Sequence, residues 1–341
     1  MERTGILLDR RYLDHNMGAF HVESPQRLEA ILGMIDQTIT FPFLSITPRA
    51  AQENELLWIH TPEHVESVRS TAGQDRVVLD PDTSTSPRSY ETALLAAGGL
   101  LECLDHILSG RIRNAFAPVR PPGHHAEAGR AMGFCLFNNV AVATEYLQRQ
   151  HGLAKILVVD WDIHHGNGTQ NAFFDRADVL YFSTHQFPHY PGTGHWSETG
   201  TGQGEGFTLN VPLLPGKTDE DFLYIFRKIL SPAARQFEPD AILVSAGFDV
   251  AATDPLGGMD ITALGFAALT RELLSLAQEL CQDRLLIALE GGYDLTALSQ
   301  GSHEVLLQLS GTGPQPDIRA EASPQLEQEL KPMLKHWGTS P

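Results

Sequence analysis

Short, continuous apolar runs recur along the chain, and segments with helical spacing separate them. The apolar runs occupy residues 6–8, 115–119, 156–159, 179–183, 241–245 and 285–289. The segments that read as helices include residues 89–108, 141–150, 219–236 and 262–281. Strands that lack a polar face are buried on both sides, as in parallel sheets that helices cover. The pattern therefore predicts an α/β protein: a single domain of three α/β/α layers with a mostly parallel central sheet.

The two ends of the chain carry boundary signals. Ser24 and Pro25 precede an apolar stripe and predict a helix that begins there, with the serine as its cap. A stretch rich in proline and glycine begins at Gly311 and leads into a short polar helix. We therefore expect one principal domain over residues 1–315 and a C-terminal helical appendage over residues 316–341.

Charge and composition narrow the class of protein. The formal net charge is −18, from 24 basic and 42 acidic residues, and this excludes nucleic acid as an expected partner because phosphate binding needs a basic surface. No apolar stretch approaches the length of a membrane helix, and the apolar run near the N-terminus is too short for a signal peptide. The three cysteines are widely spaced and form no CxxC pair. We expect a cytoplasmic protein with reduced thiols and no membrane partner.

Polar residues that can do chemistry follow five of the predicted strands. The sequences at those strand ends are RPPGHH, DWDIHH, THQ, AGFD and EGGYD. The carboxyl ends of parallel strands lie at one edge of a sheet, which is where α/β proteins bind their ligands. The sequence therefore predicts that these residues converge on a single site.

Within this group, Asp162 and His164 have the spacing of metal ligands. Residues two apart on an extended segment project to the same side, so a carboxylate and an imidazole meet there. A catalytic zinc ion takes three protein ligands and leaves a position for water, and Asp249 is the candidate for the third ligand. The alternative is a structural hydrogen-bonded pair, which a second aspartate at another strand end disfavours. An Asp/His/Asp set does not by itself separate zinc from iron or manganese.

Two further motifs offer acid–base chemistry and stabilisation of an oxyanion. The prolines and the glycine of PPGHH predict a tight turn, which would bring both His124 and His125 to one site as general base and general acid. Tyr293 of LEGGYD could donate a hydrogen bond to a developing oxyanion. The alternatives are an incidental histidine pair and a tyrosine packed at the surface.

The string HTPEH at residues 60–64 matches the HxxEH string of some metalloproteases. Thr61 and Pro62, however, read as the cap and the first residue of a helix. His60 would then lie outside the helix that contains His64, and we expect both histidines to be structural.

Four ordered motifs carry a resemblance to a known family: RPPGHHAEAGRAMGFCLFNNVAVA, DWDIHHGNGTQNAFF, SAGFDVAATDPLGG and LEGGYD. With these motifs the chain resembles the zinc-dependent histone deacetylase family, from about residue 5 to residue 310. The segments GHHAE, GNGTQ and DPLGG are similar to the corresponding motifs of the class II, histone deacetylase 6-like branch, which includes bacterial histone deacetylase-like amidohydrolases. The resemblance implies the arginase–deacetylase fold, with residues 1–315 as the deacetylase catalytic domain.

The resemblance also implies a role for each matching residue. His125 would carry the proton and His124 would assist it electrostatically, with Asp160 behind His124 and Asn167 behind His125. Tyr293 would stabilise the oxyanion. The residues implied as zinc ligands are Asp162, His164 and Asp249. The residues implied as walls and rim of a tunnel for the acylated side chain are Gly133, Phe134, Tyr190 and Leu256. The residues implied around a structural potassium ion are Asp160, Asp162, His164, Ser183 and Thr184.

The expected function is therefore removal of acetyl or related acyl groups from lysine side chains of peptides or proteins by a metal-activated water. One alternative is an amidohydrolase for acetylated polyamines or other small acetylated amines, which the acidic charge favours. Family members that select polyamines narrow the entrance of the tunnel with an insertion in the first loop or with a glutamate in the DPxG segment. Here the segment over residues 10–24 is short and Leu256 occupies the position of that glutamate, so we expect an open entrance and a lysine side chain as substrate. A second alternative, a binuclear manganese ureohydrolase, would need a DxHxD run to bridge its two metal ions. In the run that begins at Asp162, Gly166 stands in place of the last aspartate. An inactive reader of acyl-lysine is the remaining alternative, and no motif specifies an oligomeric state.

Overall fold

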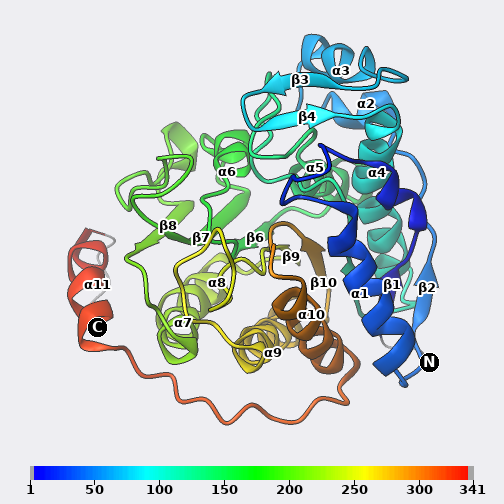
Figure 1. The fold of residues 1–341 in the computed structure, drawn as a ribbon. Coiled ribbons are helices and arrows are strands. Elements are labelled where there is room, and N and C mark those ends of the chain that lie inside the picture. The colour runs from blue at the N-terminus through cyan, green and yellow to red at the C-terminus, as the bar shows by residue number, and fades with distance from the viewer. Residues whose placement is uncertain (1–3, 337–341) are drawn as a thin grey trace.

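A computed structural model describes residues 4–336 and contains a parallel eight-stranded sheet with helices on both faces (Figure 1). The order of strands across the sheet is β2-β1-β5-β10-β9-β6-β7-β8, and every neighbouring pair is parallel. A separate antiparallel hairpin consists of β3 and β4. The strands are β1 (Thr4–Leu7), β2 (Leu44–Ile46), β3 (Val77–Asp80), β4 (Thr83–Thr85), β5 (Asn114–Ala117), β6 (Ile156–Asp160), β7 (Val179–Gln186), β8 (Thr208–Leu213), β9 (Ala241–Ala246) and β10 (Leu285–Leu289).

The helices fill the connections between these strands. They are α1 (Pro25–Thr38), α2 (Glu53–Leu56), α3 (Pro62–Arg69), α4 (Ser89–Leu108), α5 (Asn139–His151), α6 (Asn167–Phe173), α7 (Asp219–Ile225), α8 (Ser231–Phe237), α9 (Ala263–Leu280), α10 (Leu295–Ser310) and α11 (Pro324–His336). Two short 3₁₀ turns, η1 (Arg10–Asp14) and η2 (Gly202–Gly204), and a π-helical segment, η3 (Phe226–Leu230), complete the set.

Two separate hydrophobic clusters lie on the two faces of the sheet. One joins the sheet to α1 and α7–α10, and its largest fully buried side chain is Trp161, which packs against Phe226 and Phe266. The other joins the sheet to α4 and α5. Because both faces are covered, all residues of β6, β9 and β10 are buried, which is why these strands lack polar alternation in the sequence. The predicted three-layer α/β/α architecture with a parallel central sheet is confirmed.

The predicted elements lie close to the observed ones. The strand predicted at residues 285–289 and the helix predicted at 89–108 have the observed bounds. The helix predicted at 219–236 is divided into α7, η3 and α8, because its hydrogen-bonding pattern changes to π-helical in the middle. Helix α1 begins at Pro25 as predicted, but the side chain of Ser24 makes no capping hydrogen bond.

The central strands bring the chemical motifs together. The four neighbours β5, β10, β9 and β6 occupy the middle of the sheet and run in the same direction. The chain leaves β5 for β6, continues outward to β7 and β8, and returns to insert β9 and β10 between β5 and β6. The motifs that follow these four strands therefore meet at one edge of the sheet.

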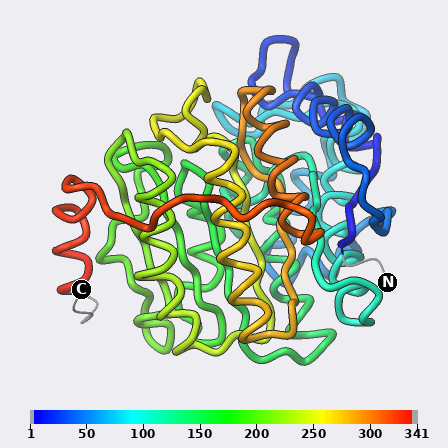
Figure 2. Tube along the Cα trace, turned by 90° about the horizontal axis from the view of Figure 1, so that it is seen from below, coloured from blue at the N-terminus to red at the C-terminus, as the bar shows by residue number. Residues whose placement is uncertain are grey.

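The C-terminal part crosses the molecule as an extended segment. Residues 311–323 run from the end of α10 to α11, which lies beside β8 at the edge of the sheet, far from the N-terminal side (Figure 2). Leu326, Leu330 and Met333 of α11 are buried. The domain boundary at residue 315 stays a prediction. Residues 1–3 of the predicted principal domain and residues 337–341 of the predicted appendage lie outside the described residues. Among the residues that are described, no helix is long and apolar enough to cross a membrane.

Candidate metal centre and active site

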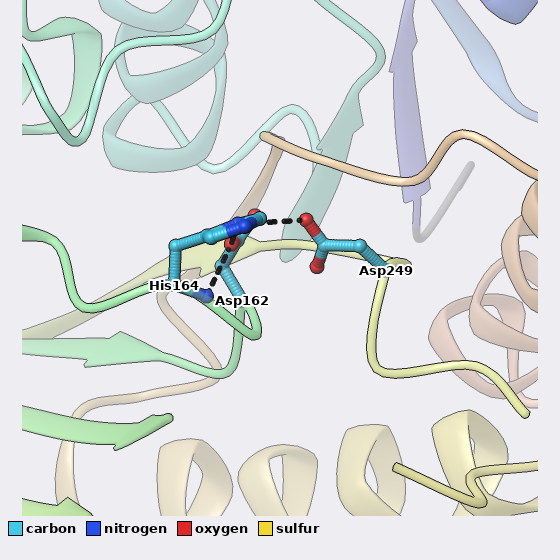
Figure 3. Close-up of side chains that lie close together, drawn as sticks. All are labelled: Asp162, His164 and Asp249. Atoms are coloured by element: carbon cyan, nitrogen blue, oxygen red, sulfur yellow. Dashed lines mark hydrogen bonds and ion pairs between the residues drawn. The ribbon is translucent and has the colours of Figure 1, made fainter. Parts of the chain in front are cut away.

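Asp162, His164 and Asp249 form a buried cluster at the carboxyl ends of β6 and β9 (Figure 3). Their ligand atoms all lie within 4.8 Å of one another. His164 Nδ1 lies 3.1 Å from Asp162 Oδ1 and 3.3 Å from Asp249 Oδ2, so the imidazole and both carboxylates face a common point. The two motifs predicted to supply these ligands are far apart in the sequence, and the structure brings them together.

The chemistry of this cluster fits a divalent metal ion. Asp249 Oδ2 is buried, and apart from its 3.3 Å contact with His164 Nδ1 it has no hydrogen-bond partner among the described residues. Burial and the charge of Asp162 raise the pKa of Asp249 to about 7. Burial lowers the pKa of His164, but its hydrogen bonds with Asp162 and Asp249 outweigh burial and raise it to about 9. Two carboxylates in one buried site repel each other unless a cation lies between them, and one imidazole with two carboxylates is a donor set that zinc accepts.

Glycines give the carboxylates the space they need. A Cβ at Gly247 would lie 2.1 Å from Asp162 Oδ2, and a Cβ at Gly291 would lie 2.0 Å from Asp249 Oδ2. The Gly291 N–H donates to Asp162 Oδ2 at 2.8 Å. The glycines of SAGFD and LEGGYD therefore allow the backbone of β9 and β10 to approach the ligands closely.

His124 lies beside this cluster in the turn after β5. Its Nδ1 lies 3.1 Å from Asp160 Oδ2, as predicted, and its Nε2 lies 3.8 Å from Asp162 Oδ1. Burial lowers the pKa of His124, but the charges of Asp162 and Asp160 outweigh burial and raise it to about 10. Of the two histidines, His124 is therefore the one whose surroundings favour the protonated form.

His125 is held in one tautomer by Asn167. The Asn167 Nδ2 group donates to the carboxylate of Glu127, so the amide oxygen faces His125 Nδ1 at 2.8 Å. A carbonyl oxygen only accepts, so Nδ1 carries the proton and Nε2 keeps its lone pair. Burial lowers the pKa of His125 well below its usual range, and the charges of His124 and His164 lower it further. His125 is therefore a neutral imidazole with a free Nε2.

Tyr293 follows β10 on the other side of the cluster. The carboxylate of Asp254 accepts hydrogen bonds from the backbone N–H groups of Tyr293, at 2.6 Å, and Asp294, at 3.0 Å. The guanidinium of Arg27 lies 4.9 Å from the centre of the tyrosine ring. Burial raises the pKa of Tyr293 well above its usual range, so the hydroxyl keeps its proton and remains a donor.

Glu290 is a residue of the site that the sequence reasoning missed. Its Oε2 accepts from the backbone N–H groups of Gly123, at 2.6 Å, and His124, at 3.2 Å, and its Oε1 accepts from Ser245 Oγ at 2.9 Å. The carboxylate thus links the ends of β5, β9 and β10 through hydrogen bonds to the backbone of the histidine turn and to Ser245. Its position in the LEGGYD motif was visible, but its partners lie 45 and 167 residues away in the chain.

A pocket of about 240 Å³ leads to the cluster. All the residues predicted to line a tunnel are on its walls, together with Asp82 and His189, which the sequence reasoning missed. The lining residues are Asp82, His125, Gly133, Phe134, His164, His189, Tyr190, Leu256 and Tyr293.

One wall of this pocket is anchored by the β3–β4 hairpin. The backbone N–H groups of Gly133 and Phe134 donate to Asp82 Oδ1, at 3.0 Å, and Thr83 Oγ1, at 2.9 Å. Gly133 and Phe134 both have positive φ, 57° and 68°, which turns the chain sharply at this point. The ring of Phe134 packs edge-on against Tyr293 with 5.9 Å between the ring centres.

The opposite wall contains His189 and Tyr190. The ring of His189 stacks on His164 at 5.0 Å, and its Nε2–H donates to the Leu256 carbonyl at 3.1 Å. Tyr190 lies edge-on to His125 at 5.1 Å. Burial, the charge of Asp82 and a hydrogen bond to Asp82 raise the pKa of Tyr190, so its hydroxyl keeps its proton.

Of the residues predicted around potassium, Asp160 lies on β6, Ser183 and Thr184 lie on β7, and Asp162 and His164 lie in the turn that follows β6. Asp160 and Ser183 are register partners on these strands, and Asp160 Oδ1 accepts from the Asp162 N–H at 3.1 Å. Thr184 Oγ1 is buried and has no hydrogen-bond partner in the described part of the chain. A potassium ion at this position stays a prediction.

The remaining histidines of the motifs have structural partners. His165 is buried and bonds Thr193 Oγ1 at 2.7 Å and Gln170 Oε1 at 3.0 Å, away from the cluster. Thr61 caps α3 by accepting from the His64 N–H, and His60 lies before that helix, as predicted. The rings of His60 and His64 are nevertheless 5.0 Å apart. Among residues 4–336, the only cluster with metal-ligand geometry is Asp162, His164 and Asp249.

The sequence of the chain is similar to those of known proteins. The "Histone deacetylase domain" family matches residues 21–309. Histone deacetylase 15 of Arabidopsis thaliana is 40% identical over 333 residues, which cover 95% of this chain and 59% of that protein. A probable deacetylase of Archaeoglobus fulgidus is 38% identical over 295 residues and covers 86% of this chain, which spans 82% of that protein.

The fold has a counterpart among solved structures. The crystal structure of the HDA15 HD domain superposes with a TM-score of 0.91 at 38% identity, over 99% of this chain and 96% of that one. The agreement extends over the whole sheet and both helical layers. On the family match, the identity to these relatives and the shared fold, the chain belongs to the histone deacetylase family, and its arginase–deacetylase fold and class II motifs are consistent with this membership.

Proposed function

We propose that the chain is a zinc-dependent deacylase that removes acetyl or related acyl groups from lysine side chains of peptides or proteins. The observation that carries this proposal is the convergence of a buried Asp162/His164/Asp249 cluster, the His124–His125 pair and Tyr293 at the inner end of a 240 Å³ pocket. A flexible, uncharged acyl-lysine side chain suits a narrow pocket with the aromatic walls Phe134 and Tyr190.

Zinc held by Asp162, His164 and Asp249 would supply a Lewis acid that polarises the substrate carbonyl and makes a water molecule more acidic. His125 can accept the proton of this water, because its Nε2 is unprotonated and Asn167 fixes its Nδ1–H. The oxygen of the water bonds to the carbonyl carbon. As the carbon–nitrogen bond of the amide then breaks, the same histidine returns a proton to the leaving amine and the acyl group departs as a carboxylate. His124, paired with Asp160, contributes positive charge next to the reaction centre.

The hydroxyl of Tyr293 would donate a hydrogen bond to the oxygen of the carbonyl group as negative charge develops there. Asp254 holds the backbone of this tyrosine, and Arg27 lies against its ring. The loss of one donor of this kind costs about a hundred- to a thousandfold in kcat. Tyr293 is therefore the position at which a small substitution best tests the mechanism.

A second candidate, the hydrolysis of small acetylated amines such as acetylpolyamines, is supported by Asp82. Its carboxylate lines the pocket and would attract an ammonium group of a polyamine. Leu256, which also lines the pocket, offers no such charge and supports the lysine substrate. The two candidates share one reaction and differ in what enters the mouth of the pocket.

Turnover of an acetyl-lysine peptide and of N-acetylputrescine by zinc-loaded protein tests both candidates. We expect peptide cleavage to dominate, and we expect Tyr293→Phe to lower kcat by about a hundred- to a thousandfold with the unfolding temperature unchanged. A preference for N-acetylputrescine would transfer the function to small amines. Absence of turnover on both substrates, with zinc bound, would contradict the proposal and favour an acyl-lysine reader.

A further inference from the structure

The C-terminal helix α11 supplies the counter-charge of a buried lysine in the deacetylase domain. Lys217 Nζ lies 2.9 Å from Glu329 Oε1 of α11, and the two side chains are 1% and 13% exposed. The other contact of this ammonium group is the Leu214 carbonyl, at 3.1 Å. A buried ammonium is costly unless it is paired, so Lys217 depends on a helix that lies beyond the matched family region, residues 21–309.

Glu329 also binds the backbone of the turn that contains Lys217. Its Oε2 accepts from the Leu214 N–H at 3.1 Å. A second contact lies at the start of α11, where the Ser323 N–H donates to Asp221 Oδ1 at 2.7 Å. Helix α11 therefore binds the 214–218 turn, directly after β8, at Leu214 and Lys217, and the residue before α11 binds the start of α7 at Asp221.

The 214–218 turn is also hydrogen-bonded to the loop that precedes α9. The Gly216 N–H donates to the Gly258 carbonyl at 2.7 Å, and the Asp260 N–H donates to the Lys217 carbonyl at 2.8 Å. Thr218 and Asp260 also form a parallel β-bridge. The 214–218 turn and the 254–260 loop thus form one hydrogen-bonded unit.

The 254–260 loop carries three features of the site. Asp254 holds the backbone of Tyr293, and Leu256 lines the pocket. A Cβ at Gly257 would lie 2.0 Å from the Asp249 carbonyl, so the loop packs directly against the backbone of a proposed metal ligand. A shift of this loop would therefore displace both the proposed oxyanion donor, Tyr293, and the pocket wall at Leu256.

We propose that Lys217 and Glu329 are positioning residues, through which α11 holds the 254–260 loop and with it Tyr293 in the geometry that turnover requires. This inference rests on the proposed deacylation, because turnover is its readout. Coupling through such a packed network is worth about 0.5–2 kcal/mol, or roughly 2- to 30-fold in rate.

The experiment compares full-length variants by kcat, KM and unfolding temperature on the acetyl-lysine peptide. Glu329→Gln removes the charge but keeps an acceptor for Leu214, and Lys217→Met removes the ammonium. We expect each to lower kcat by roughly 2- to 30-fold, because the loop holds the backbone of Tyr293 through Asp254, and to change KM as well, because Leu256 of the same loop lines the pocket. The matched control is Glu327→Gln, an exposed position of the same helix, which should leave both constants unchanged.

A purely structural role is tested with the double variant Lys217→Met/Glu329→Leu. Replacing a buried ion pair by apolar side chains often restores or raises stability, but this pair can no longer bind the backbone of Leu214. Restored stability with kcat still reduced would support positioning. A kcat that returns to the wild-type value with stability, or single variants that change only the unfolding temperature, would overturn the inference. Absence of turnover by the wild-type chain would instead be a failure of the proposed function.

Discussion

Gly133 is the position at which one added methyl group should disturb the chemistry most directly. A Cβ there would lie 2.3 Å from Cδ2 of the His125 ring. Ordinary contact between carbon atoms begins near 3.5 Å, so the imidazole must move by about 1 Å. The 2.8 Å hydrogen bond from His125 Nδ1 to Asn167 Oδ1 and the direction of Nε2 would both change.

The magnitude of the effect on activity should exceed the effect on stability. Misplacement of a catalytic group by about 1 Å can cost about a hundredfold in rate. The positive φ of Gly133, 57°, adds strain for an alanine, of roughly 1–2 kcal/mol. We therefore expect Gly133→Ala to lower kcat on the acetyl-lysine peptide by about a hundredfold, while the protein remains folded.

The assay pairs steady-state kinetics with urea unfolding. Gly129→Ala in the same loop is the matched control, because a Cβ at Gly129 meets nothing within 4 Å. In a His125→Ala background the two ring contacts at 2.3 and 2.6 Å are removed and the 2.8 Å contact with the Cβ of residue 125 remains, so Gly133→Ala should cost less stability there than in the wild type. A Gly133→Ala kcat within about threefold of the wild-type value, which is below 1 kcal/mol, would refute the reasoning.

Three further predictions concern the metal centre and the buried charges. Zn²⁺ added to chelator-stripped protein should stabilise it by about 4 kcal/mol at a thousand times the dissociation constant, and Asp249→Asn should abolish the shift in unfolding temperature. His60 should make the fold acid-sensitive: burial and the charge of His64 lower its pKa from 6.5 to about 3, so this stability is present above pH 6.5 and is lost as pH falls toward 3. Urea titrations should give a shallower loss over this range for His60→Ala, and an equal slope would contradict the assignment. Arg120→Met should cost about 3–5 kcal/mol in urea unfolding, because it removes the guanidinium 2.7 Å from the fully buried Glu23 and leaves Arg27, at 3.2 Å, as the remaining cation beside it. Adding Glu23→Gln should recover part of this loss, and a single variant as stable as the wild type would contradict the role of the pair.

The strands of the sheet interior were predictable because burial on both faces leaves a local signal in the sequence. β6, β9 and β10 are continuous apolar runs, and each was predicted. β8 was missed because Asn210 and Pro212 interrupt its apolar run, and its place at the edge of the sheet allows a proline. The β3–β4 hairpin was missed because its polar sequence, with residues such as Asp80 and Thr83, reads as a loop.

The residues of the candidate site divide in the same way. Asp162, His164, Asp249 and the two histidines follow strands directly, so strand direction alone predicts their convergence. Asp82 joins the pocket only because the hairpin folds back over Gly133, 51 residues later in the chain. A contact of that kind depends on tertiary packing and has no local pattern in the sequence.

The way in which the hairpin holds the pocket wall bears on how such an enzyme could diversify. Asp82 and Thr83 bind the wall through main-chain N–H groups of Gly133 and Phe134, and so the aromatic side chain itself takes no part in the attachment. The bore of the pocket can therefore change by substitution at Phe134 without loosening the scaffold. The attachment of the wall and the shape of the pocket thus depend on different atoms, so the shape can vary while the two backbone hydrogen bonds to the hairpin remain.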